Sequence, residues 1–270
     1  EAAFEREIEK GTIEQVKVEY DLSVVAIIGE NMRYRPGIAG RLFQALGKNG
    51  INVIAIAQGS SELNISVVVN ASNEAKTLNV LHEAFFLSDT KVLHVFMVGV
   101  GLIGSTLLKQ LRDQGPFLKK NRSLEIRIVG LANSKKMLFA EDGIDLENWK
   151  DALQSSNEVT SLDRFVNFMK GANLSNSVFI DNTASNTVPR KYMEILEASI
   201  SICTPNKIAS SSEYNLYREL KDLANRKRVA YFFETNVGAG LPVISTLSDL
   251  IHSGDEILKI EGVLSGSLSY

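Results

Sequence analysis

From residue 91 onward, near-continuous apolar runs of strand length alternate with stretches in which apolar residues recur at helical spacing. Residues 92–98 and 124–131 are two such runs, and Leu107, Leu108 and Leu111 form a helical repeat between them. This alternation predicts a doubly wound, mostly parallel sheet of the α/β class. Further strands are predicted at 178–181, 200–203, 229–233 and 257–270, and helices from Gly104 to about 114 and at 146–153, 162–169, 188–197, 213–225 and 241–251.

The first 90 residues predict a smaller unit with the order strand, helix, strand, strand, helix, which is the split βαβ arrangement of a ferredoxin-like module. Residues 13–20 alternate between apolar and polar side chains, which predicts a half-exposed strand. The closing strand of the module is therefore either this segment or one outside the chain. The boundary between the units falls near 87–90 without a Pro, Gly or Ser linker, so we expect a nearly rigid joint. The strands of the module are predicted at 22–28, 51–57 and 63–70, and its helices at 38–46 and 73–86.

Composition and charge narrow the partners and the compartment. The 270 residues carry a net charge of -3 with scattered basic residues, so we expect no nucleic-acid partner. The single cysteine, Cys203, excludes an internal disulfide and favours a reducing, cytoplasmic compartment. No apolar run approaches the roughly 18 residues of a membrane span, and the charged first residues are not typical of a signal sequence. The histidines are too far apart to predict a structural zinc site.

The segment from Val98 to Thr106 contains Gly99-x-Gly101-x-x-Gly104, placed between a predicted strand and a predicted helix. In such a turn the first glycine permits a tight bend, the second lets the backbone approach a pyrophosphate, and the third lets helix pack on strand. The helix N-terminus adds free N–H groups and a positive dipole end. The alternative is a glycine-rich surface turn, but the strand before it and the helix after it favour a dinucleotide site.

After the second strand of the larger unit, a dinucleotide fold that prefers NAD carries an acidic residue for the ribose 2′-hydroxyl. This chain instead continues with Ala132, Asn133, Ser134, Lys135 and Lys136. Hydrogen-bond donors and cations suit a 2′-phosphate, so the charge pattern favours NADP over NAD. The alternative is a solvated polar turn.

Three further loops are expected at the carboxyl edge of the sheet, where open α/β sheets bind their ligands. The segment 181–185 (DNTAS) follows one strand, and Thr204 to Lys207 (TPNK) follows the next. Lys207 has a transferable proton that suits a developing negative charge on a substrate oxygen, although it also fits an ordinary surface lysine. DNTAS also fits a helix N-cap. The segment 234–242 (ETNVGAGLP) suits either a cation held by oxygen ligands or a tight strand-to-helix connection.

Six motifs in this order, GVGLIG, LANSKK, DNTAS, TPNK, ETNVGAGLP and GVLSGSLSY, resemble homoserine dehydrogenase. The preceding RPGIAGRLF and NGINVIAIAQGSSELNISVVV resemble the bifunctional aspartokinase–homoserine dehydrogenase family, and the resemblance covers nearly the whole chain. It implies the end of a preceding regulatory region at 1–20, an ACT regulatory module at 21–88, an NAD(P)-binding Rossmann domain at 89–240 and the start of a substrate-binding and dimerisation domain at 241–270. The aspartokinase domain, a second catalytic lysine and substrate-binding carboxylates are then expected outside the chain, which alone would be inactive or weakly active.

The resemblance implies NAD(P)H-dependent reduction of aspartate 4-semialdehyde to homoserine, a step of threonine and methionine biosynthesis, in a homo-oligomer. Lys207 is the implied catalytic residue. An amino-acid effector, threonine above all, is implied near Asn52 and Gln58, which also fit turn-forming positions. A monovalent cation such as sodium is implied at Glu234, Val237, Ala239 and Leu241, largely through backbone oxygens. The residues assigned to the coenzyme are Gly99, Val100, Gly101, Leu102, Ile103, Gly104, Ala132, Asn133, Ser134, Lys135, Thr183, Ala184, Ser185 and Lys207.

Two other functions compete with this interpretation. A non-catalytic sensor of an amino acid and of nucleotide redox state needs the phosphate turn but has no need for Lys207 beside a nicotinamide. A semialdehyde dehydrogenase that works through a cysteine thioester needs Cys203 exposed and activated. Because Cys203 ends an apolar strand, we rank the thioester hypothesis last.

Overall fold

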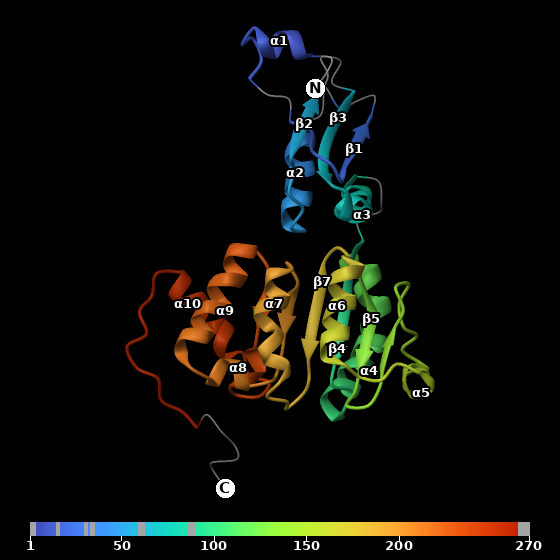
Figure 1. Cartoon of the computed structure of the whole chain (residues 1–270). Coiled ribbons are helices and arrows are strands. Elements are labelled where there is room, and N and C mark those ends of the chain that lie inside the picture. The colour runs from blue at the N-terminus through green and yellow to red at the C-terminus, as the bar shows by residue number, and fades with distance from the viewer. Residues whose placement is uncertain are drawn as a thin grey trace. The chain divides into compact units, whose positions relative to one another are not determined.

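The computed structural model describes residues 4–14, 17–29, 32, 36–58, 63–85 and 90–263. The chain divides into two compact units, one built from Glu1–Gly47 and Ile51–Leu81 and the other from Lys48–Gly50 and His82–Tyr270. Figure 1 labels most of the helices and strands of each unit. None of the helices in the described ranges combines the length and the apolar character that crossing a lipid bilayer requires.

The smaller unit is an antiparallel sheet with helices on one face. Its sheet has the order β1-β3-β2, with Leu22 opposite Asn70 and Gln58 opposite Ile65. Alternate residues of β1 and β3, such as Val25 and Val67, are buried together with Leu42 and Leu46 of α2. The elements are α1 (Glu5–Glu9), β1 (Leu22–Ile28), α2 (Ile38–Lys48), β2 (Ala55–Gln58), β3 (Asn64–Asn70), η3 (Ala71–Asn73) and α3 (Glu74–Phe85).

Two expectations for this unit were wrong. The segment predicted as a strand at 13–20 has no regular structure at 13–14 and 17–20, and 15–16 lie outside the described residues. Its alternation is not enough to form a strand because no neighbouring strand supplies hydrogen bonds, and the described sheet has three strands. The strand predicted from residue 51 begins only at Ala55. The predicted boundary at 87–90 falls almost entirely outside the described residues.

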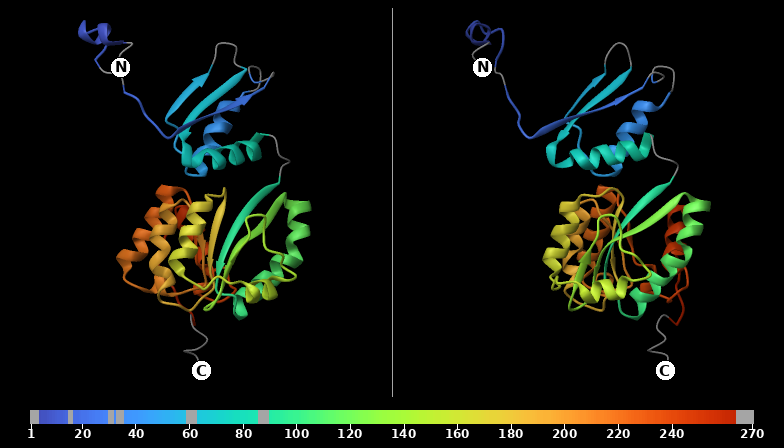
Figure 2. Two further views of the ribbon diagram at one scale, coloured as in Figure 1. Left: turned by 45° about the vertical axis from the view of Figure 1, so that its right-hand side comes forward. Right: turned by 90° about the vertical axis from the view of Figure 1, so that its right-hand side faces the viewer.

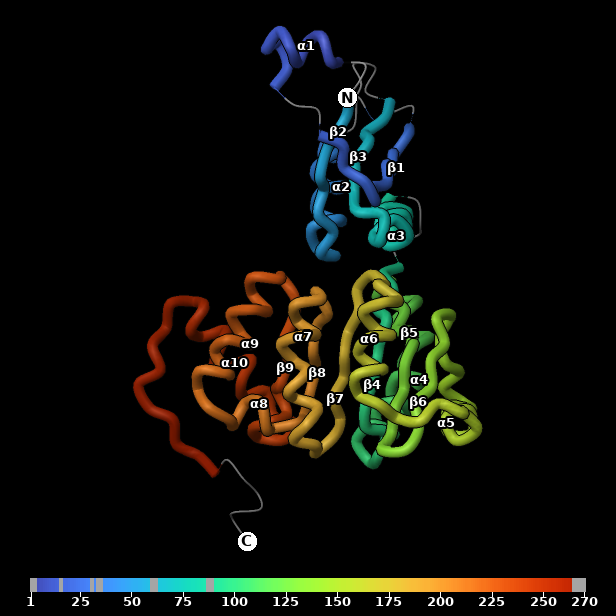
Figure 3. The backbone as a smooth tube through the Cα atoms, in the orientation of Figure 1, coloured from blue at the N-terminus to red at the C-terminus, as the bar shows by residue number. Residues whose placement is uncertain are grey.

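The larger unit is the expected doubly wound sheet. Its six strands have the order β6-β5-β4-β7-β8-β9, which can be followed in Figure 3, and only β6 runs antiparallel to its neighbour. The strands are β4 (Lys91–Val98), β5 (Leu124–Ala132), β6 (Met137–Phe139), β7 (Ser177–Asp181), β8 (Ser201–Cys203) and β9 (Tyr231–Phe232). The helices are α4 (Leu102–Arg122), α5 (Trp149–Ser155), α6 (Leu162–Ala172), η4 (Val188–Lys191), α7 (Tyr192–Glu197), α8 (Ile208–Ser211), α9 (Tyr214–Lys227), η5 (Glu234–Asn236) and α10 (Val243–His252).

Helices cover both faces of this sheet (Figure 2). Because successive strand residues point to opposite faces, Phe96 of β4 is buried in a core with residues of α6, α7 and α9, whereas Met97 is buried in a second core with α4 and α5. The chain leaves β4 toward β5 on one side and returns to β7 on the other, so β4 and β7 form the topological switch point. Ligands of open α/β sheets bind in the crevice at the carboxyl ends of such strands.

Several features of this unit differ from the sequence-based expectation, among them the short helices α8 and η5, which were not predicted. Helix α4 continues through Gly115 and Pro116 to Arg122 instead of ending near residue 114, and the left-handed Ser123 (φ 48°) follows it. The short antiparallel β6 was not predicted. The strand expected at 257–270 is absent from the described part, 257–263, and the rest of it lies outside the described residues.

Candidate coenzyme site

The glycine turn after β4 has the geometry that a pyrophosphate requires. Gly99 adopts a left-handed φ of 87°, and a Cβ there would lie 2.8 Å from the backbone of Asn182. A Cβ on Gly104 would lie 2.0 Å from the Gly99 oxygen, so this glycine lets α4 pack against the turn. A Cβ on Gly101, which is the N-cap of α4, would meet nothing within 4 Å. The turn therefore leaves open space in front of the α4 N-terminus, where backbone N–H groups favour an anion.

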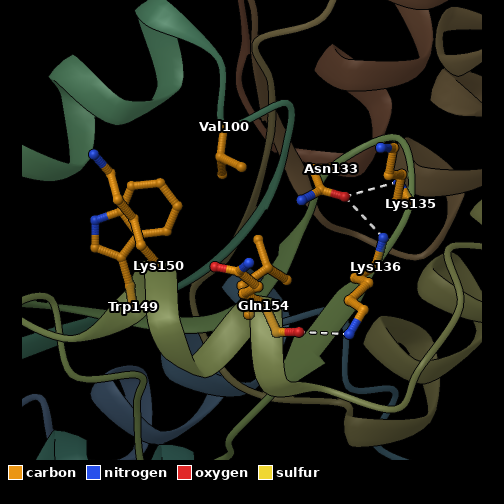
Figure 4. Close-up of a pocket in the computed structure, with 8 residues that line it drawn as sticks. Val100, Asn133, Lys135, Lys136, Trp149, Lys150 and Gln154 are labelled. Atoms are coloured by element: carbon orange, nitrogen blue, oxygen red, sulfur yellow. Dashed lines mark hydrogen bonds between the residues drawn. The ribbon is translucent and has the colours of Figure 1, made fainter.

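A pocket of about 650 Å³ lies beside this turn. Figure 4 shows that its lining comes from the glycine turn, the turn after β5 and α5. The lining residues are Val100, Asn133, Lys135, Lys136, Trp149, Lys150, Leu153 and Gln154. Lys135, Lys136 and Lys150 are its charged residues, and the lining has no acidic side chain. The positive lining suits an anionic ligand, and the flat face of Trp149 lies 5.6 Å from the Lys150 Nζ atom.

The turn after β5 is fixed by hydrogen bonds to Asn133. Its Oδ1 atom accepts hydrogen bonds from the Lys135 and Lys136 backbone N–H groups, each at 2.7 Å. Lys136 also donates from Nζ to the Gln154 backbone oxygen, which ties the turn to α5. Lys135 and Ser134 are exposed, whereas Ala132 is buried at the end of β5 and its oxygen accepts the Gly99 N–H at 2.9 Å. Lys135 is thus available to a ligand in this pocket.

Residues of α5 were missed by sequence reasoning. Trp149, Lys150 and Gln154 line the same pocket as Asn133, yet no motif marks them as ligand-binding. The only local signal is a lysine next to the single tryptophan of the chain. Their role follows from the placement of α5 against β5 and not from the spacing of residues.

The loops after β7 and β8 are joined at the carboxyl edge of the sheet. Asn206 Nδ2 donates to the Ser185 backbone oxygen at 2.9 Å and to Asp181 Oδ2 at 3.0 Å. Thr183 donates its N–H to Asp181 Oδ1 at 2.8 Å, and the Ser185 N–H bonds to Thr183 Oγ1 at 3.1 Å. The structure therefore brings Thr183 and Ser185 together with the loop that carries Lys207. Ala184 is exposed on the same loop.

Lys207 is exposed at the N-cap of α8. Among the described residues, no ion pair or hydrogen bond occupies its ammonium group, so it is available to a substrate oxygen.

A second, more apolar pocket of about 390 Å³ lies between α4 and the ends of β7, β8 and β9. Leu102 and Ile103 of the glycine motif line it together with Asn182, whose buried Nδ2 atom has no hydrogen-bond partner within the described part of the chain. Cys203 also lines it. Although part of Cys203 is exposed, its surroundings desolvate the thiol and raise its pKa, which keeps it in the neutral form. A cysteine nucleophile needs the opposite shift, so the thioester hypothesis has no support here.

The loop after β9 connects to the same edge, since Asn236 Nδ2 donates to the Asn206 oxygen at 3.3 Å. The Glu234 carboxylate accepts the backbone N–H groups of Ile244 and Ser245, each at 2.9 Å, and so caps α10. Gly238 and Ala239 adopt left-handed φ values of 72° and 52°. In the described residues no cluster of three or more His, Cys, Asp or Glu side chains forms a metal site. Any cation here therefore depends on backbone carbonyls of residues such as Val237, Ala239 and Leu241.

The two candidate effector residues are in the smaller unit. Gln58 is the last residue of β2 and Asn52 precedes that strand, and both are exposed. An extended chain rises about 3.3 Å per residue, so the two side chains lie near opposite ends of the β2 segment.

Comparison with known proteins agrees with this geometry. The chain is 42% identical over 268 residues to the chloroplastic bifunctional aspartokinase/homoserine dehydrogenase 2 of Arabidopsis thaliana, covering 99% of this chain and 29% of that protein. It is 39% identical over 270 residues to the bifunctional aspartokinase/homoserine dehydrogenase of Haemophilus influenzae, covering 100% of this chain and 33% of that protein. The chain thus spans about a third of the length of these relatives.

A crystal structure of a Candida auris protein of unknown function matches 67% of this chain and 49% of its own, with 34% identity and a TM-score of 0.60. A family model for the ACT domain matches residues 25–85. The model described as homoserine dehydrogenase, NAD binding domain, matches residues 99–234, which is half of the chain. The chain therefore belongs to the homoserine dehydrogenase family, of which it carries the NAD-binding domain preceded by an ACT domain.

Proposed function

We propose that the whole protein reduces aspartate 4-semialdehyde to homoserine with NADPH, and that this chain supplies the coenzyme site and Lys207. The observation that carries the proposal is the glycine turn of β4 opening beside a lysine-lined pocket, at the same sheet edge as the TPNK loop. The bifunctional relatives, by their names, catalyse this homoserine dehydrogenase reaction.

The described residues fit a bound NADP(H). The open space at Gly101 and the N-terminus of α4 suit the diphosphate, and Val100, Asn133 and Trp149 line the space beyond it. Lys135 and Lys150 suit a 2′-phosphate, because charge-assisted hydrogen bonds to a phosphate are strong and the pocket lining has no carboxylate that would repel it. These lining residues support NADP over NAD.

When bound, NADPH would supply the hydride for this reduction: the aldehyde carbon would gain it and become the primary alcohol carbon of homoserine, and the coenzyme would be oxidised to NADP. The aldehyde oxygen gains negative charge in this step and must take up one proton. We assign the Lys207 ammonium to stabilise that charge and to donate the proton. The loop contacts at Thr183, Ser185 and Asn206 hold the backbone around Lys207 at the sheet edge.

The Lys207→Ala variant of the whole protein tests this assignment. We expect kcat for the semialdehyde reduction to fall by about 100-fold or more, the range of general acid catalysis, whereas the Kd for NADPH changes less than threefold. Lys227→Ala, at the end of α9 and in neither pocket, is the control. An unchanged kcat in Lys207→Ala removes this lysine from the mechanism, and a wild-type protein that binds NADPH without reducing the substrate supports the sensor hypothesis.

We also propose a monovalent cation such as sodium at the loop of Glu234, Val237, Ala239 and Leu241. Since the Glu234 carboxylate already caps α10, the ligands are backbone carbonyl oxygens, which suit a hard cation. Activity that is equal in sodium chloride and in choline chloride contradicts this site. We further propose that threonine is the effector of the ACT domain, which the ACT match supports. The single cysteine supports a cytoplasmic compartment, and we propose a homo-oligomeric state as well.

A further inference from the structure

Asp181 is a fully buried carboxylate at the end of β7. Among the described residues no lysine, arginine or histidine forms an ion pair with it. A buried charge without a counter-ion is costly unless hydrogen bonds surround it. The residues that provide these hydrogen bonds therefore stabilise the buried charge of Asp181 in addition to packing around it.

Three donors satisfy the Asp181 carboxylate. Tyr192 Oη donates to Oδ2 at 2.7 Å, Asn206 Nδ2 donates to the same oxygen at 3.0 Å, and the Thr183 N–H donates to Oδ1 at 2.8 Å. The Thr204 hydroxyl donates to the Asp181 backbone oxygen at 2.8 Å. One buried residue thus contacts a helix and both loops of the candidate site.

Tyr192 is a permanent donor in this arrangement. Its side chain is fully buried at the start of α7, and burial together with the neighbouring Asp181 charge raises the pKa of its hydroxyl far above the usual range. Its ring packs edge-on against Phe179 and Tyr231, with centroids 6.5 and 6.0 Å away. The ring contacts hold the hydroxyl in place, and the hydroxyl also lies 3.1 Å from Thr204 Oγ1.

Both chain neighbours of Lys207 are fixed by the same network. Asn206 Nδ2 bridges Asp181 Oδ2 and the Ser185 oxygen, its Oδ1 accepts the Ile208 N–H at 3.1 Å, and its own N–H bonds to Thr204 Oγ1 at 2.9 Å. A shift of Asp181 or Asn206 therefore moves the Lys207 backbone relative to Thr183 and Ser185.

We propose that Asp181, Tyr192, Thr204 and Asn206 form a positioning network that sets the Lys207 loop against the Thr183–Ser185 loop for proton transfer. The inference rests on the proposed function, and it assigns the four residues no contact with the reacting atoms. Small displacements of a catalytic group lower the rate of reaction much more than they weaken binding. The network should therefore affect kcat rather than KM.

The test compares Tyr192→Phe with Tyr231→Phe in the whole protein. Both changes remove one hydroxyl from the same aromatic cluster, but the Tyr231 hydroxyl contacts Ser210 at 3.3 Å and not Asp181. We expect Tyr192→Phe to lower kcat at least tenfold with KM for the semialdehyde and Kd for NADPH within threefold, and Tyr231→Phe to match wild type. NADPH stoichiometry from calorimetry counts the folded molecules, so partial unfolding does not imitate the effect.

A Tyr192→Phe protein that folds and keeps kcat within threefold of wild type overturns the proposal, as does a rise in KM without a fall in kcat. If this variant does not fold, Thr204→Val and Thr204→Ser decide: valine is expected to lower kcat at least tenfold, and serine, which keeps the hydroxyl, to restore at least a third of it. Equal kcat in these two variants overturns the proposal. Lack of any reductase activity in the wild-type protein instead contradicts the proposed function itself.

Discussion

Gly101 and Gly104 stand three positions apart in one turn, yet they face opposite environments. Gly104 would place a Cβ 2.0 Å from the Gly99 backbone oxygen, whereas Gly101 has open space around it and a φ of -70°, which any residue adopts. Packing of the protein thus requires glycine at 104, while nothing in the protein itself requires glycine at 101. The approach of a ligand is the remaining reason for an absent side chain at 101.

We therefore predict opposite effects for two alanine variants. Gly104→Ala should destabilise the larger unit by about 1–3 kcal/mol or more, as overpacking does. Gly101→Ala should change stability by less than about 0.5 kcal/mol but lower NADPH affinity at least tenfold. Thermal unfolding and calorimetry measure the two effects. Gly115→Ala, in open space within α4, is the control; wild-type NADPH affinity in Gly101→Ala would contradict a diphosphate at this turn.

The basic residues of the pocket give a second prediction at this scale. Replacing both Lys135 and Lys150 with alanine removes two donors from a lining without acidic side chains. We expect NADPH affinity to fall by about 10- to 100-fold, as lost charge-assisted hydrogen bonds imply, and NADH affinity to change less than threefold. Fluorescence titration with each coenzyme measures the ratio of the NADPH affinity to the NADH affinity. An equal fall in NADPH affinity and NADH affinity would show that these lysines do not bind the 2′-phosphate.

Among the elements, β4 is joined to the turn before β7 by a histidine. His94 is buried on β4, and its Nδ1 atom bonds to the Ser175 backbone oxygen at 2.6 Å. Desolvation lowers the pKa of His94 below its ordinary value of 6.5, with a further contribution from Arg127, and outweighs the opposing effect of the Ser175 hydrogen bond. The neutral ring of His94 therefore helps to hold β4 beside β7.

Because the folded-state pKa of His94 is depressed, the unfolded chain takes up the proton first as the pH falls. The stability that neutral His94 contributes is complete above about pH 6.5 and is lost as the pH falls toward the folded-state pKa, by at most about 1.4 kcal/mol per pH unit. Urea unfolding between pH 7.5 and 5.5 measures this slope. We expect His94→Gln to flatten it and His252→Gln, at an exposed residue of α10, to leave it unchanged; the same slope in His94→Gln contradicts the assignment.

Elements that carry their own signal in sequence were predicted, and those that depend on neighbours were not. The continuous apolar runs of β4 and β5 predict buried parallel strands, and both strands are present. The segment 13–20 has strand-like alternation but no partner strand, and β6 has three residues that become a strand only by pairing with β5. In the site, the glycine turn could be predicted because its residues are adjacent in sequence. Lys150 and Tyr192 could not, because they reach the site only through tertiary packing, which the spacing of residues in sequence does not show.

At the scale of the whole molecule, each unit closes its own core. The two large hydrophobic clusters of the coenzyme-binding unit contain only residues from Val95 onward. The sheet of the smaller unit is likewise completed by its own helices, through residues such as Leu42, Leu46 and Leu81. The buried residues of the two large clusters all come from the larger unit, as in a domain with its own core.

A protein that begins at residue 82, where the larger unit resumes after the smaller one, is expected to keep the NADPH affinity of the longer chain within threefold, because every residue that lines the two pockets lies beyond that point. The same truncation should abolish threonine binding, which we assign to the ACT domain that the family model places at 25–85. Calorimetry with each ligand separates the two effects, with Asn52→Ala and Gln58→Ala in the longer chain as matched point variants. Threonine that still binds after the truncation would move the effector site into the coenzyme-binding unit, and a loss of NADPH binding would show that this unit depends on the smaller one.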